Sequence, residues 1–341
     1  MKINLRNAVV VFLLFCMKAL NAQDPSFSQF FSSPLNINPA LTANINADWR
    51  LISNLRDQWI GPASPYVTGT VSYDAKVFQN KTRNVEKQGN TLGMGGMLMF
   101  DRAMSGVVKS TYASLNLSYN IKLSETDYYK ERLGIGFGAI YGTKNIDFSR
   151  VDFEEQFTGY GFNKNLPTGE SALSNMKPYV SASAGITYSA SNEKSNFDIG
   201  VAAFHLNKPR QTFLKDDKEF LPIRKVAHAN FETFINERLV LNTNAIYQFQ
   251  GGADYFSVGG AIGHYLGNNL ESMATAGLWY WSKNAVIPYV GLAYKDFQFG
   301  VSYDITISKL NQASRKPSSW EVSLILRGTK KPSGIIPCPW K

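Results

Sequence analysis

From residue 48 onward, apolar and polar positions alternate along the chain. In the segment TYASLNLSYNI, residues 111–121, most odd positions are apolar, whereas even positions such as Asn116 and Ser118 are polar. Successive side chains of a β-strand point to opposite sides, so each such segment is predicted to be a strand with one apolar and one polar face. The same pattern recurs at 133–142, 297–307 and 320–327.

Strand length separates the two architectures that could use such strands. A β-sandwich buries apolar faces against each other with strands of about 5 to 6 residues. An outer-membrane barrel turns its apolar face to lipid with strands of about 9 to 11 residues. Several segments here alternate over that greater length, so we predict an all-β transmembrane outer-membrane barrel of about 14 antiparallel strands. The predicted strands are 48–57, 66–76, 91–101, 110–121, 131–142, 178–190, 196–206, 224–234, 238–249, 254–266, 272–282, 286–294, 297–307 and 318–327.

An even number of strands places both termini on one side of the membrane, which we predict to be the periplasm. Connections after odd-numbered strands are then extracellular. The two longest connections, 143–177 and 207–223, fall on that side, and the long connection 77–90 is an exception on the periplasmic side. Aromatic residues near strand ends are expected to form girdles at the two membrane interfaces. These residues are Trp49, Trp59, Tyr66, Tyr119, Tyr141, Trp279, Trp281, Tyr294 and Tyr303.

The first residues have the pattern of a secretory signal peptide. Lys2 and Arg6 precede an apolar run at 8–17, and the sequence ALNA predicts cleavage after Ala22. Cleavage removes three of the 35 basic residues and none of the 26 acidic ones, and the remaining excess is too weakly clustered to indicate nucleic-acid binding. The predicted domains are a signal peptide at 1–22, a plug or periplasmic docking segment at 23–47, the barrel at 48–328 and a periplasmic tail at 329–341.

The sequence predicts no catalytic, cofactor-binding or metal site, and hence no enzyme. None of the three histidines has a nucleophile motif nearby: they are His205, His228 and His264. The acidic stretch 152–157 lacks the ligand spacing of a calcium loop. Glycines at 93–96 and 134–138 do not have phosphate-loop spacing, and we expect them to let the backbone or a plug approach the lumen wall. Cys338 alone remains after cleavage, so an intrachain disulfide is excluded.

The segment directly after the signal peptide, QDPSFSQFFSSPLNINPALTA, is too apolar for a linker. Asp24 and Pro25 are typical of a helix start, and Pro34 is predicted to end that helix. Phe27, Phe30 and Phe31 would then form one apolar stripe. A second short helical start is possible at NINPAL, which contains Asn38 and Pro39. So short a piece needs a surface to be stable, and we predict that it docks in or beneath the barrel.

These features together resemble one family. QDPSFSQFF and NPALTA after a signal peptide, an aromatic-rich barrel and the terminal sequence of Cys338, Pro339 and Trp340 resemble the PorP/SprF family of type IX secretion system outer-membrane proteins. The resemblance implies a non-enzymatic component that supports secretion or surface attachment of substrates with a C-terminal secretion domain, such as gliding adhesins. It implies as partners outer-membrane lipid, other secretion components and a periplasmic peptidoglycan-binding lipoprotein, and it implies no cofactor.

Two other functions fit the same barrel. A fatty-acid-transporter-like channel for hydrophobic small molecules would also have fourteen strands and an Asn-Pro-Ala turn, which stands here at 38–40. Such a channel needs a continuous apolar path, whereas the inward sets consist of Gly, Ser, Asn and Gln. A purely structural anchor is the third possibility, and it would not depend on the long connection at 143–177.

Overall fold

The computed structural model describes most of the chain in eight ranges. They are residues 24–61, 64–77, 89–126, 128–169, 175–213, 219–267, 269–313 and 315–328. The predicted signal peptide, the predicted tail with Cys338, Pro339 and Trp340, and most of the connection at 77–90 lie outside these ranges.

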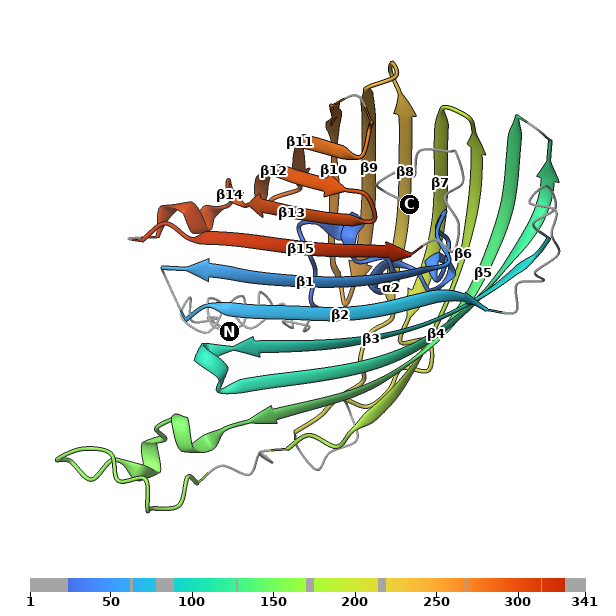
Figure 1. Cartoon of the computed structure of the whole chain (residues 1–341). Coiled ribbons are helices and arrows are strands. Elements are labelled where there is room, and N and C mark those ends of the chain that lie inside the picture. The colour runs from blue at the N-terminus through green and yellow to red at the C-terminus, as the bar shows by residue number, and fades with distance from the viewer. Residues whose placement is uncertain are drawn as a thin grey trace, which may run out of the picture.

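One antiparallel sheet runs around the described part of the molecule and closes on itself (Figure 1). Its strands are β1 (Trp49–Ile60), β2 (Tyr66–Val77), β3 (Thr91–Ala103), β4 (Val108–Glu125), β5 (Tyr129–Ile146), β6 (Tyr179–Asn192), β7 (Ser195–Phe204), β8 (Arg224–Phe234), β9 (Leu239–Gln250), β10 (Ala253–Leu266), β11 (Ser272–Trp281), β12 (Ala285–Tyr294), β13 (Phe297–Tyr303), β14 (Ile305–Thr306) and β15 (Ser318–Gly328). Sequence neighbours pair throughout, β11 pairs with β12, and β15 pairs with β1 to close the ring.

The prediction of fourteen antiparallel strands is confirmed, because β13 and β14 are one pass interrupted at Asp304. Both parts pair with β12, and the backbone N–H of Asp304 still donates to Ser319. The largest difference from the predicted boundaries is in β4 and β5, which are 18 residues each. Their pairing continues from Val108 with Ile146 to Glu125 with Lys130, where polar residues weaken the alternation that we used.

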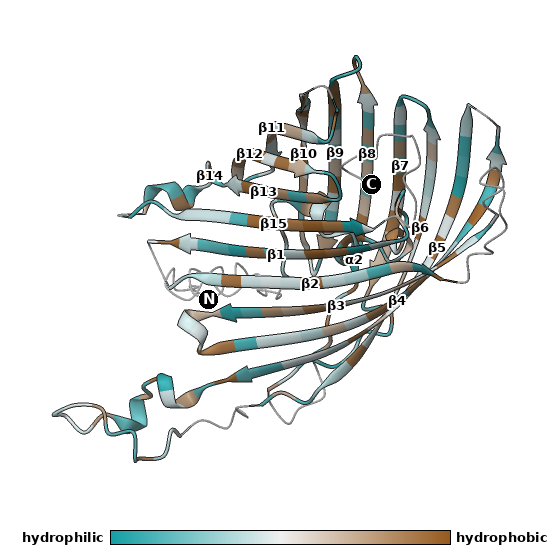
Figure 2. Ribbon diagram, viewed as in Figure 1, coloured by the Kyte–Doolittle hydropathy of each residue, from teal (hydrophilic) through white to brown (hydrophobic). Residues whose placement is uncertain are grey.

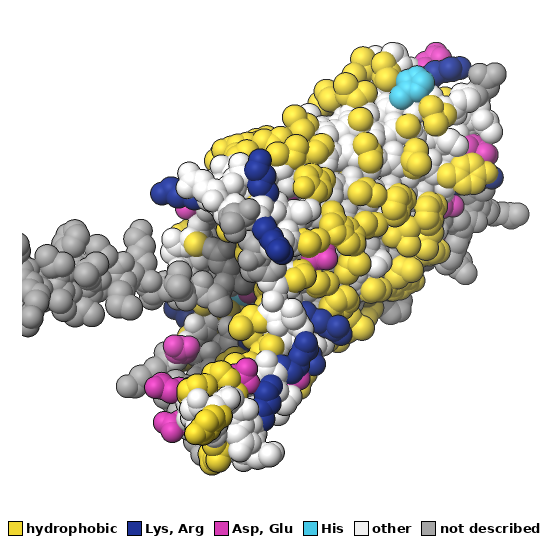
Figure 3. Space-filling model, turned by 90° about the vertical axis from the view of Figure 1, so that its left-hand side faces the viewer, with side chains coloured by type: hydrophobic (Ala, Val, Ile, Leu, Met, Phe, Trp, Pro, Cys, Tyr) yellow, Lys and Arg dark blue, Asp and Glu magenta, His cyan; other side chains and the backbone are white. Residues whose placement is uncertain are grey.

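Hydrophobic and hydrophilic residues are interspersed along the strands (Figure 2), and the two faces of the wall have opposite polarity, as the alternation predicts. In β4, Leu115 is 75% exposed on the outside, whereas Asn116 and Ser118 are buried on the lumen side. Hydrophobic side chains gather over the outer face in Figure 3, and most charged side chains in that view lie toward the ends. A closed wall with an apolar outer band satisfies all strand edges and suits contact with lipid.

Three of the predicted girdle residues face the lumen. One is Tyr66, which stands at an inward position of β2 and donates its hydroxyl to the buried Asp101. Trp279 and Trp281 are 1% and 8% exposed and point into the lumen, not toward lipid. In β11 both faces carry large apolar side chains, because Leu278 and Tyr280 are exposed on the outer face. Alternation therefore could not tell the inner face from the outer one. The wall needs these rings inside because they pack on the chain that fills the lumen.

The N-terminal segment, residues 24–47, lies inside the barrel and contains only short helical turns. The predicted helix from Asp24 to Pro34 is wrong: a 3₁₀ turn spans Phe30–Ser32, and Pro34 starts the helix α2 (Pro34–Ile37). A further turn at Pro39–Leu41 agrees with the second predicted start. Asp24 is bonded to the wall instead of capping a helix. Within the described ranges, no helix is long and apolar enough to cross a membrane.

The described chain starts and ends at opposite ends of the barrel. Asp24 contacts His205 and Gln250, which lie where β7 and β9 reach the end that carries the connections 147–178 and 205–223. We call this the long-connection end and the opposite one the short-turn end. Gly328 pairs with Trp49 at the short-turn end. The common side that we predicted for both termini therefore does not hold for the described segment, because residues 24–47 run back through the lumen before β1 begins.

The lipid-facing band predicts a depth-dependent response to charge. Leu115→Arg, in the middle of β4, is expected to lower the free energy of unfolding by about 2–4 kcal/mol, whereas Leu123→Arg near the strand end should cost about 0–1 kcal/mol. Leu123 is also exposed, at 53%, so it is a matched control. Guanidinium titration of the barrel in lipid vesicles measures both values, and equal losses would contradict a membrane-embedded outer face.

Candidate functional site

The candidate site is the lumen together with the inserted segment, residues 24–47. Sequence analysis singled out five residues of this segment. The structure buries Phe27, Phe30, Asn38 and Pro39 and leaves Phe31 half-buried against the wall. All five meet inside the barrel, whereas the predicted tail residues lie outside the described ranges. The segment therefore occupies the space that a channel would need.

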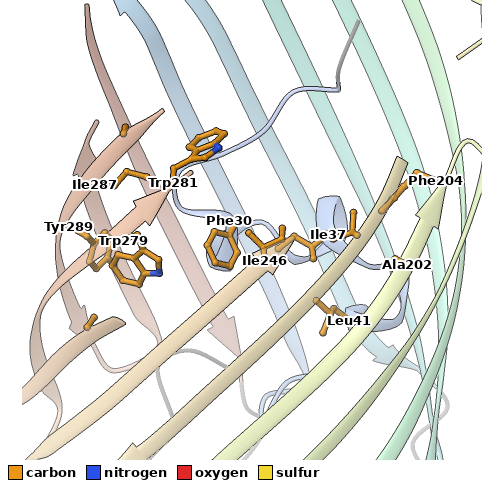
Figure 4. Packing of buried hydrophobic residues seen from close by; sticks show 13 residues of the cluster. Phe30, Ile37, Leu41, Ala202, Phe204, Ile246, Trp279, Trp281, Ile287 and Tyr289 are labelled. Atoms are coloured by element: carbon orange, nitrogen blue, oxygen red, sulfur yellow. The ribbon is translucent and has the colours of Figure 1, made fainter. Parts of the chain in front are cut away.

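The three phenylalanines contact two different walls instead of forming one stripe. Phe27 packs with Leu35 of α2 against Met97 and Met99 of β3. Phe30 enters the large buried cluster that Figure 4 shows, in which side chains from β7 to β12 converge on the segment. Phe31 stacks on Trp279, with ring centroids 4.7 Å apart, and meets Tyr289 edge to face. Without a helix, successive rings are free to reach opposite sides of the lumen.

At the long-connection end, Asp24 is fixed by an ion pair and hydrogen bonds. Its carboxylate lies 2.7 Å from His205 Nε2 and 3.2 Å from Arg224 Nε, and it accepts a hydrogen bond from Gln250. Burial alone would raise the pKa of Asp24. The charge of Arg224 and the hydrogen bond with His205 outweigh that effect and hold the pKa well below its usual range. The start of the segment is thus a buried, charged anchor.

The contacts at this anchor also contain the residue types of a nucleophile, a base and an acid. Ser181 Oγ lies 2.7 Å from His205 Nδ1, and His205 in turn contacts Asp24. However, Ser181 is fully buried at 0% exposure, and Asp24 is already paired with Arg224. A nucleophile needs room for a substrate at its oxygen. We therefore interpret these contacts as structural.

Deeper in the lumen, one arginine and two carboxylates hold the segment. Arg56 of β1 lies 2.7 Å from Asp304 and 3.8 Å from Glu321 of β15, and all three side chains are nearly fully buried. Ser28 donates its hydroxyl to Asp304 at 2.7 Å, and its backbone N–H donates to Glu321 at 2.7 Å. Gln29 donates its backbone N–H to Glu321 as well. Glu321 thus binds the backbone N–H groups of residues 28 and 29, whereas Asp304, at the interruption between β13 and β14, binds the Ser28 hydroxyl and Arg56.

Asn38 is the central polar contact of the segment. Its amide N–H groups point at the backbone oxygens of Ile186 and Val201, each 3.2 Å away, and its carbonyl accepts from Ala40 N–H at 2.8 Å. Its Nδ2 also lies 3.1 Å from His228 Nε2 of β8, so one fully buried side chain contacts three neighbouring strands. Asn38 therefore both caps the turn at 39–41 and fixes it to β6 and β7.

Glycines in the wall make this close approach possible, which confirms the prediction at Gly93, Gly95, Gly134 and Gly136, whereas the nearest atoms to Gly96 and Gly138 belong to the wall. A Cβ added at Gly136 would lie 2.2 Å from Ala40 N, and one at Gly93 would lie 2.6 Å from the Thr42 carbonyl oxygen. Real side chains do not tolerate such distances. The wall is hollowed where the turn at 39–43 rests, and only glycine leaves that space.

At the short-turn end, a second ion pair receives the end of the segment. Arg50 lies 2.7 Å from Asp74 and also donates to the Leu41 carbonyl oxygen at 3.3 Å. Asp74 accepts the Ala43 backbone N–H at 2.6 Å, and Ser118 donates its hydroxyl to the Thr42 carbonyl oxygen. The segment is therefore held at both ends and in the middle by buried polar groups.

Sequence reasoning missed most of these polar partners. They are Asp24 in its true role, Arg50, Arg56, Asp74, His205, Arg224, His228, Asp304 and Glu321. A signal was present in the sequence. The charged strand residues among these partners stand at inward positions of the alternation, and neither a water-filled lumen nor a lipid-facing surface would require paired charges there. Charges at inward positions of a barrel indicate partners inside the lumen.

The geometry of the lumen supports binding and closure. Buried charges are matched to backbone groups of the inserted segment. The ranges that the structure describes contain no group of three or more His, Cys, Asp or Glu side chains that could hold a metal ion. The lumen is built to keep residues 24–47 in one position.

The glycine contact predicts that Gly136→Val expels the turn at 39–43. The added methyl groups would overlap Ala40, so the segment should become cleavable by protease in the purified barrel, with cut sites identified by mass spectrometry. Gly96→Val is the control, because its nearest atom, Ser114 O, lies 3.4 Å from a Cβ. Equal protection of the segment in both variants would contradict the fit described here.

The buried charges predict a large stability effect at Arg56. Arg56→Met leaves Asp304 and Glu321 without their cation and should cost about 3–5 kcal/mol of unfolding free energy. Lys283→Met removes an exposed partner of Asp254, with Lys283 78% exposed, and should cost less than about 1 kcal/mol. Guanidinium unfolding followed by tryptophan fluorescence compares them. A loss at Arg56 no larger than that at Lys283 would count against the network.

The chain is similar to one protein family and to several solved structures. The family model described as "Type IX secretion system membrane protein PorP/SprF" matches residues 19–326. A FadL homologue from Pseudomonas aeruginosa is similar at TM-score 0.47 and 10% identity, over 84% of this chain and 91% of that one. The Pseudomonas putida toluene transporter TodX is similar at TM-score 0.45 and 11% identity, over 89% and 94%. No curated protein matches the chain.

At these identities the likeness to solved structures concerns the fold alone. The family match says more than the likeness of fold, because it is a match of sequence. It extends from the end of the predicted signal peptide through the inserted segment and into β15. It takes in both parts of the candidate site, the wall and the chain that fills it. The protein therefore belongs to the PorP/SprF family of type IX secretion system membrane proteins.

Proposed function

We propose that this protein is a closed, non-enzymatic outer-membrane barrel of the type IX secretion system. In this role it supports secretion or surface attachment of a substrate with a C-terminal secretion signal, such as a gliding adhesin. The observation that carries the proposal is the occupied lumen: residues 24–47 are held by Asp24, by the cluster at Arg56 and by the pair of Arg50 and Asp74. A barrel filled in this way serves as a scaffold, and its outward loops are left to bind partners.

The long-connection end supplies the binding surface in this proposal, and we infer that it faces the outside of the cell. The connection between β5 and β6 carries a small hairpin in which Phe157 pairs with Phe162 and Thr158 N–H donates to Gly161 O. Its three aromatic side chains are exposed, with Tyr160 fully so, and Glu154 and Glu155 stand beside them. Exposed aromatic groups at a protruding loop are typical of protein interfaces.

The short-turn end is the proposed periplasmic side, where other secretion components and a peptidoglycan-binding lipoprotein would dock. The hairpin of β4 and β5 extends there, with Tyr128 at 73% exposure. Lys122 and Lys130 pair with Glu125 near its tip. The predicted tail, residues 329–341, is assigned the same side in this proposal, since Gly328 ends β15 at that rim.

A channel for hydrophobic small molecules remains the alternative function. It would need a continuous apolar path, whereas the described lumen face carries Ser, Asn, Arg, Asp and Glu and is spanned by the inserted segment. The apolar cluster around Trp279 lines only one side and is packed against Phe30 and Phe31. Liposome swelling or fatty-acid uptake by the purified barrel would favour the channel.

The hairpin gives the test of the proposed function. In cells lacking the gene, a variant with Phe157→Ser, Tyr160→Ser and Phe162→Ser should insert into the outer membrane but lose most surface retention of the secreted protein. Loss of the aromatic anchors removes the binding energy that such residues supply at interfaces. Surface proteins are quantified by protease shaving and mass spectrometry.

Tyr247→Ser provides the matched control, because it removes an exposed tyrosine from the outer face of β9, outside both proposed docking surfaces. It should leave surface retention unchanged. Normal export and retention in the gene deletion itself would refute the secretion role, whereas normal retention in the hairpin variant alone would support a purely structural anchor.

A further inference from the structure

Six polar side chains form a regular grid on the lumen face of β7, β8 and β9. Strand register pairs Asp198 with Asn230 and Asn230 with Asn244 in one row. The next row, two residues along each strand, consists of Asn196, Glu232 and Asn242. Neighbouring strands lie about 5 Å apart and the rows about 7 Å apart, so the six side chains cover one continuous patch of the lumen face. They line a pocket that Phe31 of the inserted segment completes.

The two carboxylates of this grid fix the orientation of its amides. Asn230 donates its NH₂ group to Asp198 at 2.6 Å, which turns the Asn230 carbonyl toward Asn244. Asn244 donates to that carbonyl at 3.0 Å. A carboxylate only accepts hydrogen bonds, so each amide in this row must present its oxygen away from Asp198. The second row is oriented in the same way, since Asn242 donates to Glu232 at 3.4 Å.

As a result, two carbonyl oxygens end in the pocket without a partner. Asn242 and Asn244 are 1% and 3% exposed, and within the described ranges neither side-chain oxygen accepts a hydrogen bond. A buried acceptor left without a partner costs free energy, so a ligand that supplies positive charge or donors is favoured here. Asn230, Asn242 and Asn244 each use an amide N–H within the grid, whereas the oxygens of Asn242 and Asn244 face the pocket without a donor.

We propose that this pocket binds a hard divalent cation, with Ca²⁺ as its ligand class. The oxygens available are two carboxylates and two amide carbonyls, which are the groups that Ca²⁺ prefers. The site has fewer carboxylates than most calcium sites, because two of its four ligand groups are amide carbonyls. The charge of Arg327 acts on Glu232, so Asp198 is the carboxylate that we expect to contribute most to cation binding.

The position of the pocket gives the cation a structural role at the short-turn half of the lumen. Asn196 is the second residue of β7 and Glu232 is close to the end of β8, so the grid lies toward that rim. His228, the nearest titratable group in the row above, is bonded to Asn38 of the inserted segment. Cation binding would thus tie three strands of the wall together beside the inserted segment, independently of any secreted substrate.

Terbium luminescence tests this site in the full-length mature barrel, refolded in detergent without lipopolysaccharide. Tb³⁺ takes the same oxygen ligands and is excited through Trp279, which stacks on Phe31 at the pocket. We expect saturable luminescence that Ca²⁺ displaces with a dissociation constant of about 10⁻⁴–10⁻³ M, as for sites with few charged ligands. Asp198→Asn should weaken Ca²⁺ competition about tenfold or more.

Two further variants keep the test decisive. Asn244→Ala removes one free carbonyl oxygen without touching a charge, and it should also weaken binding if Asp198→Asn fails to fold. Asn116→Ala removes a buried lumen amide from β4, far from the grid, and should leave the titration unchanged. The proposal is overturned if Ca²⁺ up to about 10 mM displaces no signal, if Asp198→Asn binds as well as the parent, or if methylammonium displaces Tb³⁺ and Ca²⁺ does not.

Discussion

The ion contacts of Arg56 with Asp304 and Glu321 are the interaction on which the arrangement of this barrel depends. Three charged side chains are withdrawn from water inside the wall, which costs several kcal/mol per ion unless each finds partners. The wall alone does not supply enough of them. The inserted segment does, through the hydroxyl of Ser28 and the backbone N–H groups of Ser28 and Gln29. Wall and segment therefore require each other.

This mutual dependence explains features of the barrel that otherwise look like defects. Asp304 interrupts the thirteenth strand because its side chain is held by Arg56. Gly136 and Gly93 have no side chain because the turn at 39–43 occupies the space where a Cβ would lie. Trp279 faces inward because Phe31 stacks on it. Each of these three features coincides with a contact to residues 24–47, which occupy the lumen.

Much of the wall could be predicted from the sequence, and little of the lumen. Alternation over ten or more residues is a local property, so the passes through the membrane followed directly from it, as did the polar lining at Asn116 and Ser118. The ends of β4 and β5 did not, because beyond the lipid both faces of a strand can be polar. The helix predicted at Asp24 failed for a similar reason: tertiary contacts with Arg224 and His205 outweighed a local capping preference.

By itself, the sequence determined the strand pattern, the even number of passes, the glycines that permit close approach and the family resemblance. All of these rest on spacing between near neighbours in the chain. Only the tertiary structure decided that residues 24–47 run through the lumen, that Arg56 meets Asp304 and Glu321, and that Asp198 and Asn244 share one pocket. These contacts join residues that are distant in sequence, and barrel closure and strand register, which no local pattern encodes, bring them together.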